Sequence, residues 1–111
     1  MMREKKLRKT KEYATVYRRG EKIYGKYVLL FFMPNQQEIS RFGVVTTKKV
    51  GNAVIRNKWR RRIKEIVREY GDDLQSGYDI IVLARPRIKE SEFSSVKKDI
   101  TRVLRKARLL R

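Results

Sequence analysis

Three apolar runs along the chain have the length and composition of buried β-strands. Residues 27–33 (YVLLFFM) are apolar or aromatic throughout, and residues 41–47 (RFGVVTT) and 78–84 (YDIIVLA) are rich in β-branched side chains. Residues 23–24 predict a further short strand. Because only a short loop, 34–40, separates the first two long runs, we expect these two strands to pair with each other in antiparallel fashion.

Apolar residues at helical spacing predict three helices. The first begins with Thr10 as its N-cap and ends at Gly20, a residue that suits the left-handed cap conformation. The second follows Asn52 and ends near Gly71, and the third spans residues 91–107. The apolar stripe of the second helix consists of Ile55, Trp59, Ile63, Ile66, Val67 and Tyr70.

The order of these elements is helix, two or three strands, helix, strand, helix. Such mixing around one sheet predicts an α+β sandwich, in which helices pack on a central, mostly antiparallel sheet. No internal repeat, low-complexity tract or linker interrupts the chain. We therefore expect residues 1–111 to form a single domain.

The net charge of the chain indicates the kind of partner that it binds. The chain has 30 Lys and Arg against 12 Asp and Glu, a net charge of +18 on 111 residues, and a polyanionic partner would offset the self-repulsion. Cysteine is absent, which excludes disulfides and Cys-based zinc sites. The basic N-terminus is not followed by an apolar segment, and the longest apolar run is too short to span a bilayer. We expect a cytoplasmic protein with no membrane contact.

The positive charge is concentrated in residues 48–64 (KKVGNAVIRNKWRRRIK), in which eight of seventeen residues are Lys or Arg. No acidic residue occurs from 39 to 64. Arginine grips phosphate through a planar fork, and backbone N–H groups at a helix start also favour phosphate. The segment therefore predicts a nucleic-acid-binding helix, with a small ribosomal protein that binds ribosomal RNA as one candidate.

Autonomous catalysis has little support. Histidine, the commonest general base and metal ligand, is absent. The carboxylates do not cluster as acid–base pairs, and Glu65 and Glu69 are placed for ordinary pairing with neighbouring arginines on a helix. An independent nuclease is therefore disfavoured against a binding protein.

The segment 46–65 (TTKKVGNAVIRNKWRRRIKE) resembles the signature of the bacterial ribonuclease P protein subunit, in which Lys-Lys, Gly-Asn-Ala-Val and Arg-Asn-Arg precede further Lys and Arg on a helix. Lys58 stands where the family usually has Arg, and Lys keeps the charge but loses the planar fork. The similarity continues through Leu7, an aromatic first helix ending at Gly20, an apolar strand before Pro86 and a basic last helix. It spans nearly the whole chain.

The resemblance implies that the protein is not the catalyst. In this family a large RNA subunit removes the 5′ leader of precursor tRNA with bound Mg²⁺, and the small basic protein binds that RNA and the leader. The expected partners are thus the catalytic RNA subunit and precursor tRNA, with no obligate protein partner. No catalytic residue and no metal site are expected on the protein. The family fold also implies a left-handed strand–helix–strand crossover, against the general preference for right-handed connections.

The resemblance assigns two groups of residues. The expected contacts to the RNA subunit are Arg56, Asn57, Lys58, Arg60, Arg61, Lys64 and Arg68. The expected leader-binding cleft, between the first helix and the sheet, is formed by Tyr13, Tyr17, Val45, Thr47, Lys48 and Lys49. Tyr13 and Tyr17 are four residues apart and share one helix face, where aromatic rings on a basic background would hold single-stranded RNA. Core packing of that helix is the alternative for each tyrosine.

Alternation along the strands assigns side chains to faces. In residues 41–47 we expect Phe42 and Val44 to enter the core and the opposite, smaller side to form the cleft floor. In residues 27–33 the pattern leaves open whether Leu30 with Phe32, or Leu29 with Phe31, lines the cleft. Trp59 is expected to anchor the core.

Overall fold

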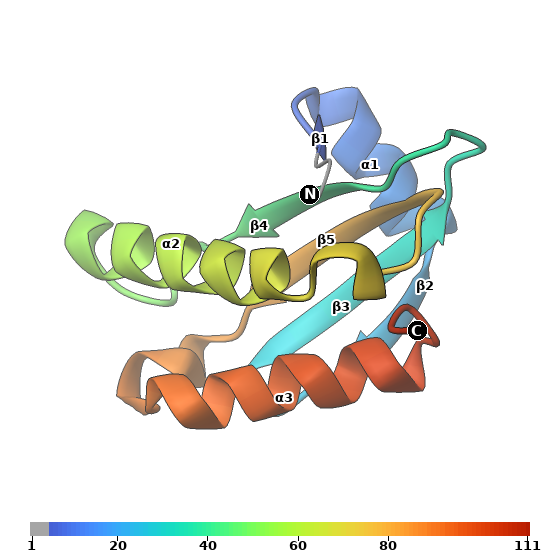
Figure 1. Cartoon of the computed structure of the whole chain (residues 1–111). Helices are drawn as coiled ribbons and strands as arrows, with labels where there is room; N and C mark the ends of the chain where they lie inside the picture. The colour runs from blue at the N-terminus through green and yellow to red at the C-terminus, as the bar shows by residue number, and fades with distance from the viewer. Residues whose placement is uncertain (1–4) are drawn as a thin grey trace.

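The computed structural model describes residues 5–111 and consists of one sheet and the helices packed on it (Figure 1). Its elements are β1 (Lys5–Lys6), α1 (Thr10–Arg19), β2 (Glu21–Tyr24), β3 (Val28–Pro34), β4 (Arg41–Val45), α2 (Ala53–Glu69), the 3-10 helix η1 (Gly71–Asp73), β5 (Tyr78–Ala84), the 3-10 helix η2 (Pro86–Glu90) and α3 (Phe93–Lys106). This order confirms the predicted α+β class, and β1 is an additional short strand that the sequence pattern did not predict.

The strand order is β1-β4-β5-β3-β2. The expected pairing of residues 27–33 with 41–47 is therefore wrong, because β5 lies between β3 and β4. Its central residues Ile80, Ile81 and Val82 are at most 1% exposed, so the strand with this apolar centre occupies the position that is covered on both faces. The longest ladder, β3 with β5, is antiparallel, as is β2 with β3, whereas β5 with β4 and β4 with β1 are parallel.

The parallel neighbours β4 and β5 are connected through α2 in a left-handed crossover (Figure 1). This agrees with the expectation from the family resemblance and departs from the right-handed rule for such connections. As a consequence, α2 and α3 cover the same face of the sheet, and α1 lies on the opposite face.

Each face of the sheet has its own apolar cluster. The larger cluster joins α2 and α3 to the sheet and contains Phe42, Val44 and Trp59, which confirms the three core predictions. The smaller cluster joins Val16 of α1 to Phe31 and Ile81. Within β3, Leu30 and Phe32 belong to the larger cluster, and Leu29 and Phe31 lie on the α1 side. The α1 side of the sheet is thus formed by Leu29 and Phe31.

Helix termini differ in detail from the pattern. The N-cap of α1 is Lys9 and not Thr10, because the Glu12 carboxylate accepts hydrogen bonds from the backbone N–H groups of Lys9 and Arg8, both 3.0 Å. Gly20 does end α1, but its φ of −75° is not left-handed. A side chain there would lie 2.5 Å from the Val16 carbonyl oxygen, so close backbone approach explains the glycine.

Candidate nucleic-acid interface

The side of α2 that faces away from the apolar stripe is cationic. Asn52 begins the helix by accepting a hydrogen bond from the Ile55 N–H at 3.0 Å, and the buried residues Trp59, Ile63, Ile66 and Val67 fix the rotation of the helix about its axis. Among the predicted RNA-subunit contacts, Asn57, Lys58, Arg61 and Arg68 are exposed, and Arg56, Arg60 and Lys64 are half-buried. All seven residues lie on this one helix, within four turns.

Two arginines of α2 differ in what they contact. Arg56 is half-buried, and its Nε is buried without a hydrogen-bond partner among the described residues. Arg62 has its guanidinium carbon 5.3 Å from the Trp59 ring centroid and 5.7 Å from that of Phe93 on α3. Arg62 therefore joins α2 to α3 by cation–π contacts, which explains why it does not belong to the cationic side.

The turn before α2 presents the predicted lysines. Thr47, Lys48 and Lys49 are exposed, while Val50 is fully buried beside them. The Val50 N–H donates to the Thr47 carbonyl at 3.0 Å, and the Gly51 N–H donates to the Lys48 carbonyl at 3.2 Å. Hydrogen bonds within the turn and the buried side chain of Val50 therefore fix its conformation, and both lysines are exposed.

Both tyrosines of α1 contact the sheet, and neither is fully buried. The Tyr13 hydroxyl donates to the Leu7 carbonyl at 3.1 Å, and the ring lies over Gly43, where an added Cβ would be 2.1 Å from the hydroxyl. Tyr17 is 39% exposed and its ring meets Phe31 edge to face, with centroids 4.8 Å apart. Partial burial raises the pKa of both phenols, so they stay neutral at physiological pH.

Val45 is half-buried and packs on the α1 side of the sheet, close to the smaller apolar cluster. Thr47 lies beyond the end of β4 and not in the strand, so only Val45 of the two is a strand residue. The aromatic and apolar side chains on this face are half-exposed. Each therefore packs partly against the sheet and leaves part of its surface accessible.

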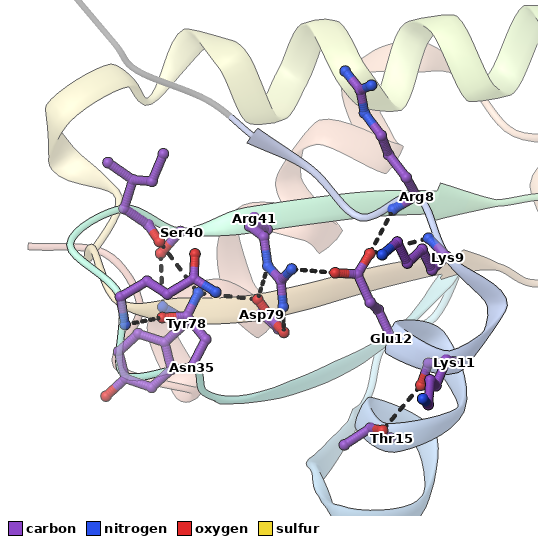
Figure 2. Close-up of polar contacts among 12 residues, drawn as sticks. Arg8, Lys9, Lys11, Glu12, Thr15, Asn35, Ser40, Arg41, Tyr78 and Asp79 are labelled. Atoms are coloured by element: carbon purple, nitrogen blue, oxygen red, sulfur yellow. Dashed lines mark hydrogen bonds and ion pairs between the residues drawn. The ribbon is translucent and has the colours of Figure 1, made fainter.

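An ion network that the sequence pattern did not predict holds α1 against the sheet (Figure 2). Arg41 on β4 donates from Nε and Nη2 to the two Asp79 oxygens on β5, at 2.8 and 2.6 Å, and from Nη1 to Glu12 on α1. Asn35 also donates to Asp79, at 3.0 Å. The signal in the sequence was an Asp inside an apolar strand, which requires a partner when buried.

The two predicted groups of residues approach each other at β4. A small cavity of about 70 Å³ is lined by Tyr13 from α1 and Lys64 from α2, with Gly43 and Val44 between them. The cationic side of α2 and the α1 face of the sheet are thus adjacent surfaces that meet around the edge formed by β1 and β4.

Neither a metal centre nor a membrane segment is found in residues 5–111. This part of the chain has no group of three or more His, Cys, Asp or Glu that could hold a metal ion. Within the same residues, no helix is long and apolar enough to cross a membrane.

Fold and surface together define a class of protein: a small basic α+β sandwich, built on a left-handed crossover whose helix is cationic on its outer side. Comparison with known proteins makes this specific, because the family model for ribonuclease P matches residues 1–108. The ribonuclease P protein component of Syntrophomonas wolfei is 36% identical over 104 residues, covering 94% of this chain and 87% of the relative.

Solved structures agree. The Staphylococcus aureus RNase P protein superposes with a TM-score of 0.89 at 26% identity, covering 96% of this chain and 97% of that chain. The Thermotoga maritima RNase P protein gives 0.84 at 27% identity, covering 92% and 96%. The chain belongs to the ribonuclease P protein family. It is the protein component of a ribonucleoprotein enzyme of tRNA processing and works with an RNA subunit.

Proposed function

We propose that the cationic side of α2 binds the catalytic RNA subunit. Exposed Asn57, Lys58, Arg61 and Arg68 and half-buried Arg56, Arg60 and Lys64 supply the contacts. The observation that carries this proposal is the cationic outer side of α2, where Lys58, Arg61 and Arg68 are exposed on one helix. Guanidinium groups on that side can bind phosphate oxygens through charge-assisted hydrogen bonds.

The α1 face of the sheet is the proposed site for the 5′ leader of precursor tRNA. Tyr13 and Tyr17 offer partly exposed rings on the same face as half-buried Val45, and exposed Thr47, Lys48 and Lys49 supply hydrogen bonds and charge. Single-stranded RNA is held in this way when stacking and phosphate contacts replace base-specific reading. The adjacency of this face to α2 would allow one protein to contact the leader and the RNA subunit together.

The catalytic metal is proposed to be Mg²⁺ bound through the RNA subunit. Cleavage chemistry would then belong to the RNA, and the protein would position the substrate and lower the electrostatic cost of bringing two polyanions together. Such an assembly is expected to work in the cytoplasm, with no further protein required.

A triple substitution tests the RNA-subunit surface. Replacing Arg56, Arg60 and Arg61 with Ala removes three cations that lie mostly off the apolar stripe and are not among the fully buried residues of α2, so the fold should persist. We expect weaker binding to the RNA subunit, with the slope of log affinity against log salt reduced by about 0.7 to 0.9 for each lost phosphate contact. Binding is measured over a salt series, and circular dichroism checks the fold.

The matched control removes three exposed cations of α3, Lys98, Arg105 and Lys106, at the same change in net charge. If the surface is specific, this control loses less affinity than the α2 variant. Equal losses in both triple variants would mean that net charge alone drives binding, and the assignment to α2 would be wrong.

A further inference from the structure

Tyr24 is an exposed aromatic residue that the proposed sites do not use. It ends the edge strand β2 and is 64% exposed, more than Tyr17 at 39%. An aromatic ring held so far into solvent by a strand gains little from packing. Its surroundings indicate what it could bind.

The strand register places Tyr24 at one end of an open row on the α1 face. Tyr24 is the direct partner of Leu29, Leu29 of Leu83, and Leu83 of Val45. Direct cross-strand partners point to the same face of a sheet. Leu29, Leu83 and Val45 are each half-buried, so α1 covers this row incompletely. The row leads from Tyr24 across β3, β5 and β4 toward the exposed turn that carries Lys48.

One lysine connects Tyr24 to the tyrosines of α1. The Lys22 ammonium lies 4.7 Å from the Tyr24 ring centroid and 5.3 Å from that of Phe31. Phe31 in turn meets Tyr17 with centroids 4.8 Å apart. Aromatic rings and one cation are therefore in continuous contact from α1 to the edge of the sheet. The cation lies over the Tyr24 ring, and Tyr24 is nevertheless 64% exposed.

The turn that follows Tyr24 is held rigidly. Buried Asp99 of α3 accepts hydrogen bonds from the backbone N–H groups of Lys26 and Tyr27, at 3.0 and 2.7 Å. Arg85 donates to the Gly25 carbonyl at 2.8 Å. Although burial opposes ionisation, these backbone donors keep the pKa of Asp99 below its usual value. Tyr24 is thus attached to a fixed hairpin, and little ordering entropy opposes binding to it.

We propose that Tyr24 and Lys22 form an additional position for single-stranded RNA, which extends the leader site from α1 to the edge of the sheet. A base stacks on the exposed ring of Tyr24, and Lys22 contacts the adjoining phosphate. This inference rests on the proposed leader site. It adds two residues that lie outside the α1 helix and outside the segment 46–65.

The chemistry of β2 favours RNA over a second copy of the chain. The free edge of β2 is only four residues long and carries charged Glu21 and Lys22, both features that oppose strand pairing between molecules. Lys22, which lies between the rings of Tyr24 and Phe31, instead complements a nucleotide, because the phosphate can bind the ammonium group while the base stacks on Tyr24.

The experiment compares precursor tRNA with mature tRNA, each bound to protein assembled with its RNA subunit. Tyr24→Ala should weaken binding of precursor tRNA roughly 5-fold to 100-fold while leaving mature tRNA nearly unchanged, since one base stack is lost. Tyr24→Phe keeps the ring and should bind like the wild type. Lys22→Ala should reduce precursor binding more than Lys89→Ala, which removes an exposed lysine from η2.

Fluorescence of a tryptophan introduced at position 24 measures the contact with RNA directly. Tyr24→Trp keeps a stacking ring, and the only native tryptophan, Trp59, is 1% exposed. Emission from the new indole should be quenched by precursor tRNA and not by mature tRNA.

Tyr17→Ala in the same assay separates this inference from the proposed function. If Tyr17→Ala loses leader-dependent affinity and Tyr24→Ala does not, the extension is wrong and the leader site stands. If neither variant loses it, the leader site itself is wrong. Equal losses for both tRNAs in Tyr24→Ala, or a wild-type dimer in sedimentation that Tyr24→Ala dissociates, would also overturn the proposal.

Discussion

Arg41 joins α1 to the sheet through two carboxylates on different elements. Its side chain is 13% exposed and that of Asp79 is 9% exposed, so this pair is largely removed from water. A bidentate guanidinium–carboxylate contact pairs the two charges, and Nη1 donates to Glu12. The stability of the α1 attachment therefore depends on one residue that no RNA contact requires.

Arg41→Met is expected to destabilise the protein by about 3 to 5 kcal/mol, because it leaves Asp79 charged and buried without its partner. Adding Asp79→Asn to the Arg41→Met variant should restore part of the lost stability, because the unpaired carboxylate is then removed. Urea unfolding of the single and double variants measures both effects. As a comparison, Lys97→Met breaks an exposed pair with Glu69 and should cost much less; a similar cost for the two single variants would contradict this account.

Glu12 makes the stability pH-dependent. Backbone N–H groups of Lys9 and Arg8, with the charge of Arg41, lower its pKa from 4.5 to about 2. A carboxyl with a depressed folded-state pKa stabilises the protein above about pH 4.5 and loses this contribution as pH falls toward 2. The difference in melting temperature between wild type and Glu12→Gln should therefore be largest near neutral pH and shrink below 4.5.

Glu90→Gln, an equal change of charge at an exposed site, is the control for the Glu12 experiment. A wild-type advantage over Glu12→Gln that persists undiminished at pH 2.5 would show that the carboxylate is not the source of the stability.

At the scale of elements, one glycine of β4 allows α1 to pack closely against that strand. Gly43 leaves room for the Tyr13 ring, whose hydroxyl also bonds the Leu7 carbonyl. This close approach lets α1 lie near the sheet, with Tyr13 and Val45 packed against the same apolar cluster. The element packing, more than any single contact, sets where the proposed leader surface lies.

Gly43→Ala should push the Tyr13 ring aside, costing about 1 to 3 kcal/mol of stability as overpacking does. Leader-dependent affinity should fall with it, while affinity for the RNA subunit is retained. A double-mutant cycle with Tyr13→Ala checks the cause, since the glycine substitution should cost little once the ring is gone. Additive losses of stability in that cycle would show that the strain does not come from contact between the new side chain and the Tyr13 ring.

Across the whole molecule, positive charge is the dominant feature of the protein. The chain carries a net charge of +18 and no histidine. Three of its described carboxylates, Glu12, Asp79 and Asp99, are used in structure. What the folded chain offers a polyanion is therefore positioned charge and aromatic surface.

The purified protein alone is expected to leave precursor tRNA uncut, whereas together with the RNA subunit it should promote 5′ processing at low Mg²⁺. Cations on α2 would replace part of the metal needed to hold two RNAs together. Single-turnover cleavage over a magnesium series, with and without protein, measures this. Metal-dependent cleavage by RNA-free protein that survives removal of contaminating nucleases would refute it.

The sequence by itself determined the three α-helices, the three long strands and the side of α2 that is buried. Apolar periods of 3.6 and 2 residues report which side of each element is buried, so Trp59, Phe42 and Val44 were correctly predicted as core. The same periodicity separates Arg61 and Arg68 from that core, and the ordered motif from Lys48 to Glu65 was enough to indicate the family.

Only the tertiary structure decided which elements are neighbours. Alternation in β3 defines two faces but does not say that Leu29 and Phe31 meet α1, because both faces are apolar. Strand order depends on long-range burial, which placed β5 between β3 and β4 and brought Arg41 beside Asp79. The row that ends at Tyr24 exists only because four strands share one register, a property of the assembled sheet and of no segment alone.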